Sequence, residues 1–144
     1  MNVVNIERRD GIARVAINRP DKRNALNDDV RNLLIAELPK LLGDDAVRAI
    51  VLTGEGGHFC AGGDIASMEK LDSKGARARM KANHLIVRMI AEAEKPVVTA
   101  VEGFAVGAGA GLAMLGDTAV IAEKGTIGFP FFRVGLIPDY GILH

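Results

Sequence analysis

Two clusters of glycine constrain the fold of this 144-residue chain more than any other feature. Of its 17 glycines, five lie between Gly54 and Gly63 and five more between Gly103 and Gly116. Glycine is used where the backbone turns with positive φ or approaches another group closely. Each cluster follows a short apolar run typical of a buried strand, over 49–53 and 97–101. Since a helical pattern comes after each loop, the order strand, glycine loop, helix occurs twice and predicts an α/β fold.

The remaining patterns add a hairpin, a long helix and further short strands. The turn signal Asp10-Gly11 separates strand patterns over 3–7 and 13–17 and predicts a hairpin. Asn27 is a candidate N-cap for a helix that closes at Gly43, in which Pro39 is expected to kink the helix or end its hydrogen bonding early. We also expect helices over about 74–93 and 108–115, strands over 118–122 and 126–129, and a turn over 137–141.

Charge and composition exclude several classes of protein. Eighteen Lys and Arg balance eighteen Asp and Glu, whereas a nucleic-acid binder would show a basic surplus. The length and the 49% apolar content fit one globular domain over 1–144, and no apolar run is long enough for a membrane span. A single cysteine, Cys60, favours the cytoplasm. This cysteine and the three histidines lack the spacing of metal ligands, so no metal site is expected.

The two glycine loops could hold an anion, because free N–H groups converge where a loop enters a helix. The dinucleotide-binding pattern Gly-x-Gly-x-x-Gly fails, since Leu112 or Met114 stands at its third glycine, and no Walker-type phosphate loop is present. One N–H from each loop could instead form an oxyanion hole, in which each donor is worth roughly 3–4 kcal/mol. Two ordinary tight turns are the alternative.

Three motifs carry a resemblance to a known family. They are Asn18-Arg19-Pro20 with Asn24-Ala25-Leu26, then Phe59 to Ile65, then Gly103 to Gly111. In order and spacing they resemble the crotonase superfamily, the enoyl-CoA hydratases and isomerases. The resemblance implies a spiral of repeated ββα units that binds an acyl-CoA thioester, with the N–H groups of Gly63 and Ala108 holding the thioester oxygen of an enolate. CoA is then part of the substrate, and no separate cofactor is expected.

The resemblance also implies which segments hold the CoA moiety. These are the backbone around 22–26 and 61–65, with Lys22 or Arg23 near the CoA phosphates, although a solvated loop is the alternative for these two side chains. The implied CoA-binding residues are Lys22, Arg23, Ala25, Leu26, Ala61, Gly62, Asp64 and Ile65.

Family members continue beyond the position of His144. The resemblance implies further helices there, which complete the pocket and pack subunits into trimers or hexamers. We therefore expect a truncated or split chain, or a part of a longer one, in which the C-terminal helical part is absent. A homo-oligomer is expected of the full-length form, and exposed apolar surface is expected of the short one.

The catalytic residues depart from the hydratase pattern. The two hydratase glutamates correspond to Gly111 and Phe131, neither of which can move a proton. Asp139 matches the position used by epoxyphenylacetyl-CoA isomerases and related enzymes. Among apolar neighbours such as Phe129, Phe131 and Phe132 its pKa would be raised, which suits a proton shuttle in double-bond isomerisation. A purely structural role in the Pro-Asp turn is the alternative.

His84 opens a second enzymatic alternative. It stands 55 residues before Asp139, as the matching histidine does in chlorobenzoyl-CoA dehalogenases, which implies an aspartate nucleophile and a histidine that activates water. Against this, Ala82 and Asn83 stand where those enzymes have tryptophans, and a solvated helix histidine is the simpler interpretation. A catalytically degenerate acyl-CoA-binding fragment is the third alternative.

Overall fold

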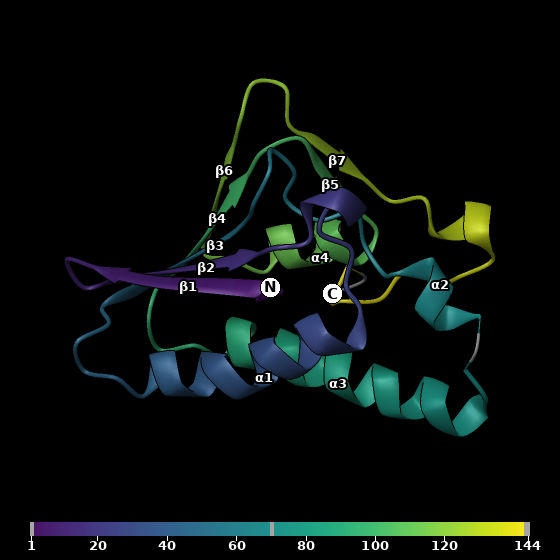
Figure 1. The fold of residues 1–144 in the computed structure, drawn as a ribbon, viewed down its shortest axis with the longest axis horizontal. Coiled ribbons are helices and arrows are strands. Elements are labelled where there is room, and N and C mark those ends of the chain that lie inside the picture. Colours follow the sequence, from purple (N-terminus) through teal and green to yellow (C-terminus); the bar gives the residue numbers. More distant parts are fainter. Residues whose placement is uncertain (1, 70, 143–144) are drawn as a thin grey trace.

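The computed structural model describes residues 2–69 and 71–142 and shows a mixed α/β fold (Figure 1). In this part of the chain five strands form the main sheet in the order β1-β2-β3-β4-β6. The first pair is antiparallel, and all other neighbours are parallel. The strands are Val4–Arg9 (β1), Ile12–Ile17 (β2), Ala49–Gly54 (β3), Val97–Val101 (β4) and Thr118–Ile121 (β6).

The N-terminal hairpin has the turn that its sequence predicts. Asp10 and Gly11 both take positive φ, at 52° and 79°, which is the backbone that a two-residue hairpin turn needs. This turn sets the register in which Val4 faces Ile17 and Arg9 faces Ile12. The pairing buries Ala13, Val15 and Ile17 of β2 against the core.

Two long helices lie side by side along one side of the molecule (Figure 1). They are α1, Asp28–Leu42, and α3, Ser73–Ala91. Asn27 caps α1 as predicted, because its Oδ1 accepts a 3.1 Å hydrogen bond from the N–H of Val30. Asp72 caps α3 in the same way, through a 2.7 Å hydrogen bond from the N–H of Gly75.

Pro39 does not end α1, which continues past it to Leu42. A proline inside a helix removes one N–H and therefore one hydrogen bond. The last turn keeps a 2.9 Å hydrogen bond from the N–H of Gly43 to the carbonyl of Pro39, and Leu38 and Leu41 are both buried in the core.

Short strand segments that follow the main strands along the chain form a second layer. β5, Phe104–Val106, pairs parallel with β7, Thr126–Gly128, and single parallel bridges join Leu26 to Gly63 and Cys60 to Ala105. The helix α4, Ala108–Met114, follows β5 and is buried over six of its seven residues. Successive stretches of chain thus add to both layers, which confirms the ββα spiral.

Four short elements were not predicted from the sequence. They are β5, the helix α2 (Ile65–Met68) and two 3-10 turns, η1 (Pro20–Lys22) and η2 (Phe131–Val134). Segments this short carry little periodicity, and β5 also lies inside the second glycine cluster, where no strand was expected. β6 and β7 were predicted as consecutive strands, and the structure shows them in different sheets.

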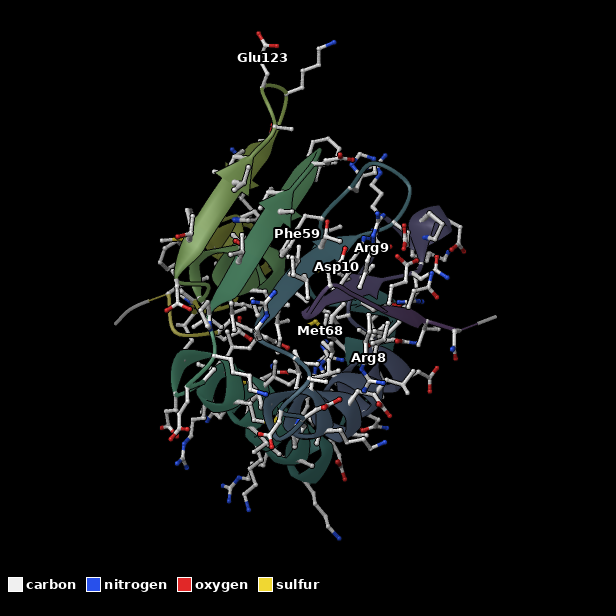
Figure 2. All side chains as sticks on the ribbon, turned by 90° about the vertical axis from the view of Figure 1, so that its left-hand side faces the viewer. Arg8, Arg9, Asp10, Phe59, Met68 and Glu123 are labelled. Carbon is white, nitrogen blue, oxygen red and sulfur yellow. The ribbon has the colours of Figure 1, made fainter. Side chains whose placement is uncertain are left out.

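The core lies between the main sheet, the two long helices and α4. Phe59 is fully buried there, whereas Glu123 lies at the far tip of the loop between β6 and β7 (Figure 2). Within residues 2–69 and 71–142, no helix combines the length and the apolar character needed to cross a membrane. The loops that leave β2, β3 and β4 carry the predicted motifs.

Candidate active site

The two segments predicted to bind CoA run side by side. The N–H of Ala61 donates to the carbonyl of Arg23 at 2.9 Å, and the N–H of Leu26 donates to the carbonyl of Gly62 at 2.8 Å. A half-buried ion pair of 3.0 Å between Arg19 and Asp64 ties the same segments together. The structure therefore brings the eight predicted residues of 22–26 and 61–65 into one region.

Within this region the basic side chains face outward. Lys22 and Arg23 are exposed, whereas Leu26 and Gly62 are buried. The Arg23 guanidinium lies 5.5 Å from the centre of the Phe104 ring. The imidazole ring of His58 stacks on the same Phe104 ring, with the two ring centres 4.9 Å apart. Arg23 is thus ordered by an aromatic contact while it stays accessible to an anionic ligand.

Asn24 holds this loop in a shape that few residues adopt. Its φ is 59°, its Oδ1 accepts from the N–H of Arg19, and its Nδ2 donates to the carbonyls of Glu55 and His58. Asparagine tolerates positive φ better than most residues, and its amide satisfies three backbone groups here. The sequence placed Asn24 in a motif but gave no sign of this supporting role.

The two glycine loops pack backbone against backbone. A Cβ on Gly62 would lie 2.6 Å from the carbonyl oxygen of Val106, and a Cβ on Gly109 would overlap the carbonyl of Cys60. Only glycine permits this approach. Among the described residues, the N–H groups of Gly63 and Ala108 donate to no protein acceptor. Both are therefore free to donate to a ligand.

All four predicted catalytic residues line one cavity of about 700 Å³. They come from different parts of the fold: Gly63 after β3, His84 on α3, Ala108 at the start of α4, and Asp139 after η2. Much of the remaining lining is apolar. It includes Met68, Leu71, Met80, Phe131, Val134 and Leu136.

Asp139 is the half-buried carboxylate of this cavity. Its Oδ2 accepts a 3.3 Å hydrogen bond from Nδ2 of Asn83, and its Oδ1 is buried without a hydrogen-bond partner among the described residues. Burial raises the pKa of Asp139 above its ordinary value, against the opposing pull of the Arg31 and Arg79 charges. A carboxylate whose pKa is raised by burial is a stronger base than an ordinary aspartate, which suits it to accept and return a proton.

The expectation that Phe129, Phe131 and Phe132 are apolar neighbours of Asp139 is wrong for two of the three. Phe131 is buried and lines the cavity. Phe129 and Phe132 are 47% and 82% exposed and do not line it. Phe132 falls outside because η2 points Phe131 inward and Phe132 outward, whereas Phe129 lies before η2, in the segment that leaves β7.

A buried polar network fixes the orientation of Asn83. Its Oδ1 accepts from Nε of Arg31 at 2.9 Å and from the hydroxyl of Tyr140 at 3.0 Å. Arginine can only donate, so the amide oxygen must face Arg31 and the amide nitrogen must face Asp139. The sequence missed this network, because its members lie on α1, on α3 and after η2.

Gly111, the position that the resemblance assigns to one hydratase glutamate, has no room for a side chain. A Cβ on Gly111 would lie 2.5 Å from Cβ of Tyr140 and 3.0 Å from its carbonyl oxygen. Tyr140 is itself buried, and burial raises the pKa of its hydroxyl, so it remains a neutral donor. A glutamate at position 111 could enter only if the segment around Tyr140 moved away.

His84 and Cys60 lie in different environments, one exposed and one buried. His84 is exposed on α3 at the cavity wall, next to Asn83. Cys60 is fully buried, and burial raises the pKa of its thiol to about 12, which leaves it uncharged. In the described part of the chain, no three side chains of metal-ligating type lie together.

The fold and the cavity define the class of this molecule as a ββα-spiral α/β protein. A solved enoyl-CoA hydratase/isomerase from Mycobacterium paratuberculosis superposes with a TM-score of 0.91 at 33% identity, covering 98% of this chain and 57% of that chain. The family model "Enoyl-CoA hydratase/isomerase" matches residues 7–144. The chain belongs to the enoyl-CoA hydratase/isomerase family.

Curated relatives of the chain carry several different activities in their names. The 1,2-epoxyphenylacetyl-CoA isomerase of Escherichia coli K12 is 36% identical over 91% of this chain and 52% of its own length. The crotonyl-CoA hydratase of Syntrophomonas wolfei is 36% identical over 94% and 53%. The 4-chlorobenzoyl coenzyme A dehalogenase-1 of an Arthrobacter species is 35% identical over 94% and 51%. The chain spans about half the length of these relatives.

Proposed function

We propose that this chain acts on acyl-CoA thioesters and isomerises or rearranges the double bond of an unsaturated acyl group. The observation that carries the proposal is the half-buried carboxyl group of Asp139, which has no hydrogen-bond partner at its buried Oδ1 among the described residues; Asp139 lines the same cavity as two backbone N–H groups without protein acceptors. Charge can develop at those N–H groups while a proton moves at Asp139. Neither hydratase glutamate is present at Gly111 or Phe131, which favours isomerisation over hydration.

The proposed reaction needs only one acid/base group. The thioester oxygen accepts hydrogen bonds from the N–H groups of Gly63 and Ala108, and ionised Asp139 removes a proton from one carbon of the acyl group. The electron pair of that C–H bond moves into the thioester, and the resulting enolate oxygen is stabilised by the two donors. Asp139, now protonated at Oδ1, returns the proton to a different carbon, so the double bond moves and the mass is unchanged.

CoA binding is proposed for the paired loops. Their backbone, from Lys22 to Leu26 and from Ala61 to Ile65, offers carbonyl and N–H groups beside the cavity. Arg23, held over Phe104, and the exposed Lys22 offer positive charge to the CoA phosphates. A ligand bound there would pass its acyl end by Gly63 into the cavity.

Mass spectrometry with a panel of unsaturated acyl-CoAs in oxygen-18 water tests this proposal. Isomerisation gives a rearranged product of unchanged mass, whereas hydration or hydrolysis adds labelled oxygen. The Asp139→Asn variant should lose turnover by about 10²–10⁴-fold while it retains binding of the thioester. Full activity in that variant would overturn the role of Asp139. Tight binding with no chemistry on any thioester would favour an acyl-CoA-binding protein instead.

A second candidate is hydrolytic dehalogenation through Asp139 as nucleophile. It is favoured by the place of His84, which lines the same cavity as Asp139, and by the similarity to the Arthrobacter dehalogenase. In that reaction Asp139 displaces halide from the aryl ring, and His84 activates the water that hydrolyses the aryl ester. One turnover of 4-chlorobenzoyl-CoA in oxygen-18 water would then label Asp139. An unlabelled Asp139 after release of chloride would exclude the ester.

A further inference from the structure

Two guanidinium groups converge on Gly63, beside the proposed oxyanion hole. Nη2 of Arg79 lies 3.0 Å from the position that a Cβ on Gly63 would take, and Nη2 of Arg31 lies 4.0 Å from the same point. These two nitrogens are therefore at most 7.0 Å apart. Both arginines line the cavity that contains Asp139. They reach it from different helices, Arg31 from α1 and Arg79 from α3.

The protein neutralises this pair of charges incompletely. Arg31 is 2% exposed, and its described ion pair is a 3.4 Å contact from Nη1 to Asp28, whose side chain is 70% exposed to solvent. Arg79 makes no ion pair within the described residues, and its Nη1 donates to the neutral hydroxyl of Ser67 at 3.0 Å. Nη2 of neither arginine donates to a described protein group.

Holding two like charges together in an apolar cavity is costly unless an anion joins them. Burial, and then the neighbouring charge of Arg31, lower the pKa of Arg79 below its ordinary value. The charged form of Arg79 is therefore destabilised in this cavity. Asp139 is the carboxylate of this cavity, and its Oδ2 is already turned toward Asn83. Ionised Asp139 offsets the two arginine charges through space, but among the described residues it forms no ion pair with either, and once Asp139 carries a proton the arginines have no negative partner in the cavity.

We propose that the acyl group of the substrate carries a carboxylate, which binds Nη2 of Arg79 and Nη2 of Arg31. The substrate class is then the CoA thioester of a short dicarboxylic acid, and the inference rests on the proposed function. A carboxylate has two oxygens and can accept from both guanidinium groups at once. The acyl group must be short, because both nitrogens lie close to Gly63, whose N–H is proposed to hold the thioester oxygen.

Matched pairs of thioesters test the proposal by binding alone. Succinyl-CoA and butyryl-CoA have the same chain length and the same CoA, as do glutaryl-CoA and pentanoyl-CoA, so titration calorimetry isolates the terminal carboxylate. We expect the dicarboxylyl member of one pair to bind about tenfold or more tightly than its neutral partner. Equal affinities within both pairs, or tighter binding of the neutral members, would overturn the inference.

Variants on one helix then assign the preference to a residue. Arg79→Met should remove the preference for the dicarboxylyl thioester and leave the affinity for butyryl-CoA within a few-fold. Arg77→Met is the control, since Arg77 is exposed on the same helix and does not line the cavity. An equal loss of both affinities in Arg79→Met would contradict the assignment. Absence of binding by every thioester would instead overturn the proposed function, and this inference with it.

Discussion

Asn83 decides which oxygen of Asp139 can carry a proton. Its Nδ2 donates to Oδ2 of Asp139, so a proton on Asp139 must sit on Oδ1, the oxygen without a protein partner. Asn83 touches no reacting atom in the proposed mechanism and acts as a positioning residue. Arg31 and Tyr140 make this orientation the stable one, because both donate to its Oδ1.

The substitution Asn83→Asp should raise the pKa of Asp139 further. The new carboxylate keeps the hydrogen bonds to Arg31 and Tyr140, but it repels the charged form of Asp139 and competes for the positive charge of Arg31. Carbon-13 NMR of the Asp139 carboxyl group would show the higher pKa, and the acid limb of the pH–rate profile would move the same way. Asn32→Asp, exposed on α1, is the control. An unchanged titration of Asp139 would refute the positioning role.

Asp139 itself should make the protein less stable as pH rises. Because the pKa of Asp139 in the folded chain is raised above its ordinary value of 3.8, the native state binds more protons than the unfolded state between the two values. The free energy of unfolding therefore falls as pH increases through that window. The Asp139→Asn variant lacks this fall. Urea unfolding at several pH values should therefore show its free energy of unfolding rising relative to that of the wild type as the pH approaches neutrality. The surface change Asp45→Asn serves for comparison, and parallel curves for wild type and Asp139→Asn would contradict the argument.

The residues of the site differ in how far the sequence could predict them. Asp139, Gly63 and Ala108 stand in contiguous motifs, so their places could be carried over. The partners Arg31, Asn83 and Tyr140 meet across 52 and 57 residues of sequence, and no local pattern marks them. A similar limit explains Phe132, because only the geometry of η2 decides which of Phe131 and Phe132 turns inward.

At the scale of elements, Gly109 sets how closely α4 approaches the loop after β3. A Cβ on Gly109 would lie 2.8 Å from Cβ of Cys60, in addition to its overlap with the Cys60 carbonyl. Gly109→Ala should therefore push α4 away and destabilise the chain by about 1–3 kcal/mol, with weaker thioester binding because Gly63 and Ala108 separate. Gly128→Ala is the matched control, since its Cβ would meet only Val106, at 3.8 Å. Urea unfolding checks both variants, and equal stabilities would contradict this account.

Elements with a clear period were the predictable ones. The apolar runs of β3 and β4, the hairpin, and the capped helices α1 and α3 all appear where the sequence places them. β5 was missed because it exists through its pairing with β7, which lies 22 residues further along the chain. Pairing between distant segments is a tertiary effect that local propensity does not contain.

At the scale of the whole molecule, β6 is the last strand of the main sheet and all four of its residues are exposed. An exposed apolar edge strand invites pairing with another chain. Val120→Lys, at a position 59% exposed, should therefore lower self-association with little change in stability. Sedimentation velocity over a range of concentrations measures this, with Thr118→Lys on the same strand as comparison. An unsubstituted chain that stays monomeric at every concentration would refute self-association through β6. The trimer or hexamer of the full-length form remains a prediction.

The buried Tyr140 gives this chain a built-in optical reporter. It is the single tyrosine in a sequence without tryptophan, so ultraviolet fluorescence and near-ultraviolet dichroism near 280 nm come from this one ring. Its hydroxyl meets an α3 side chain that also binds α1, and its Cβ packs on α4. The signal of Tyr140 therefore changes only when three distant stretches of chain have come together around the cavity. Spectroscopy on the unlabelled protein can follow the assembly of the site itself.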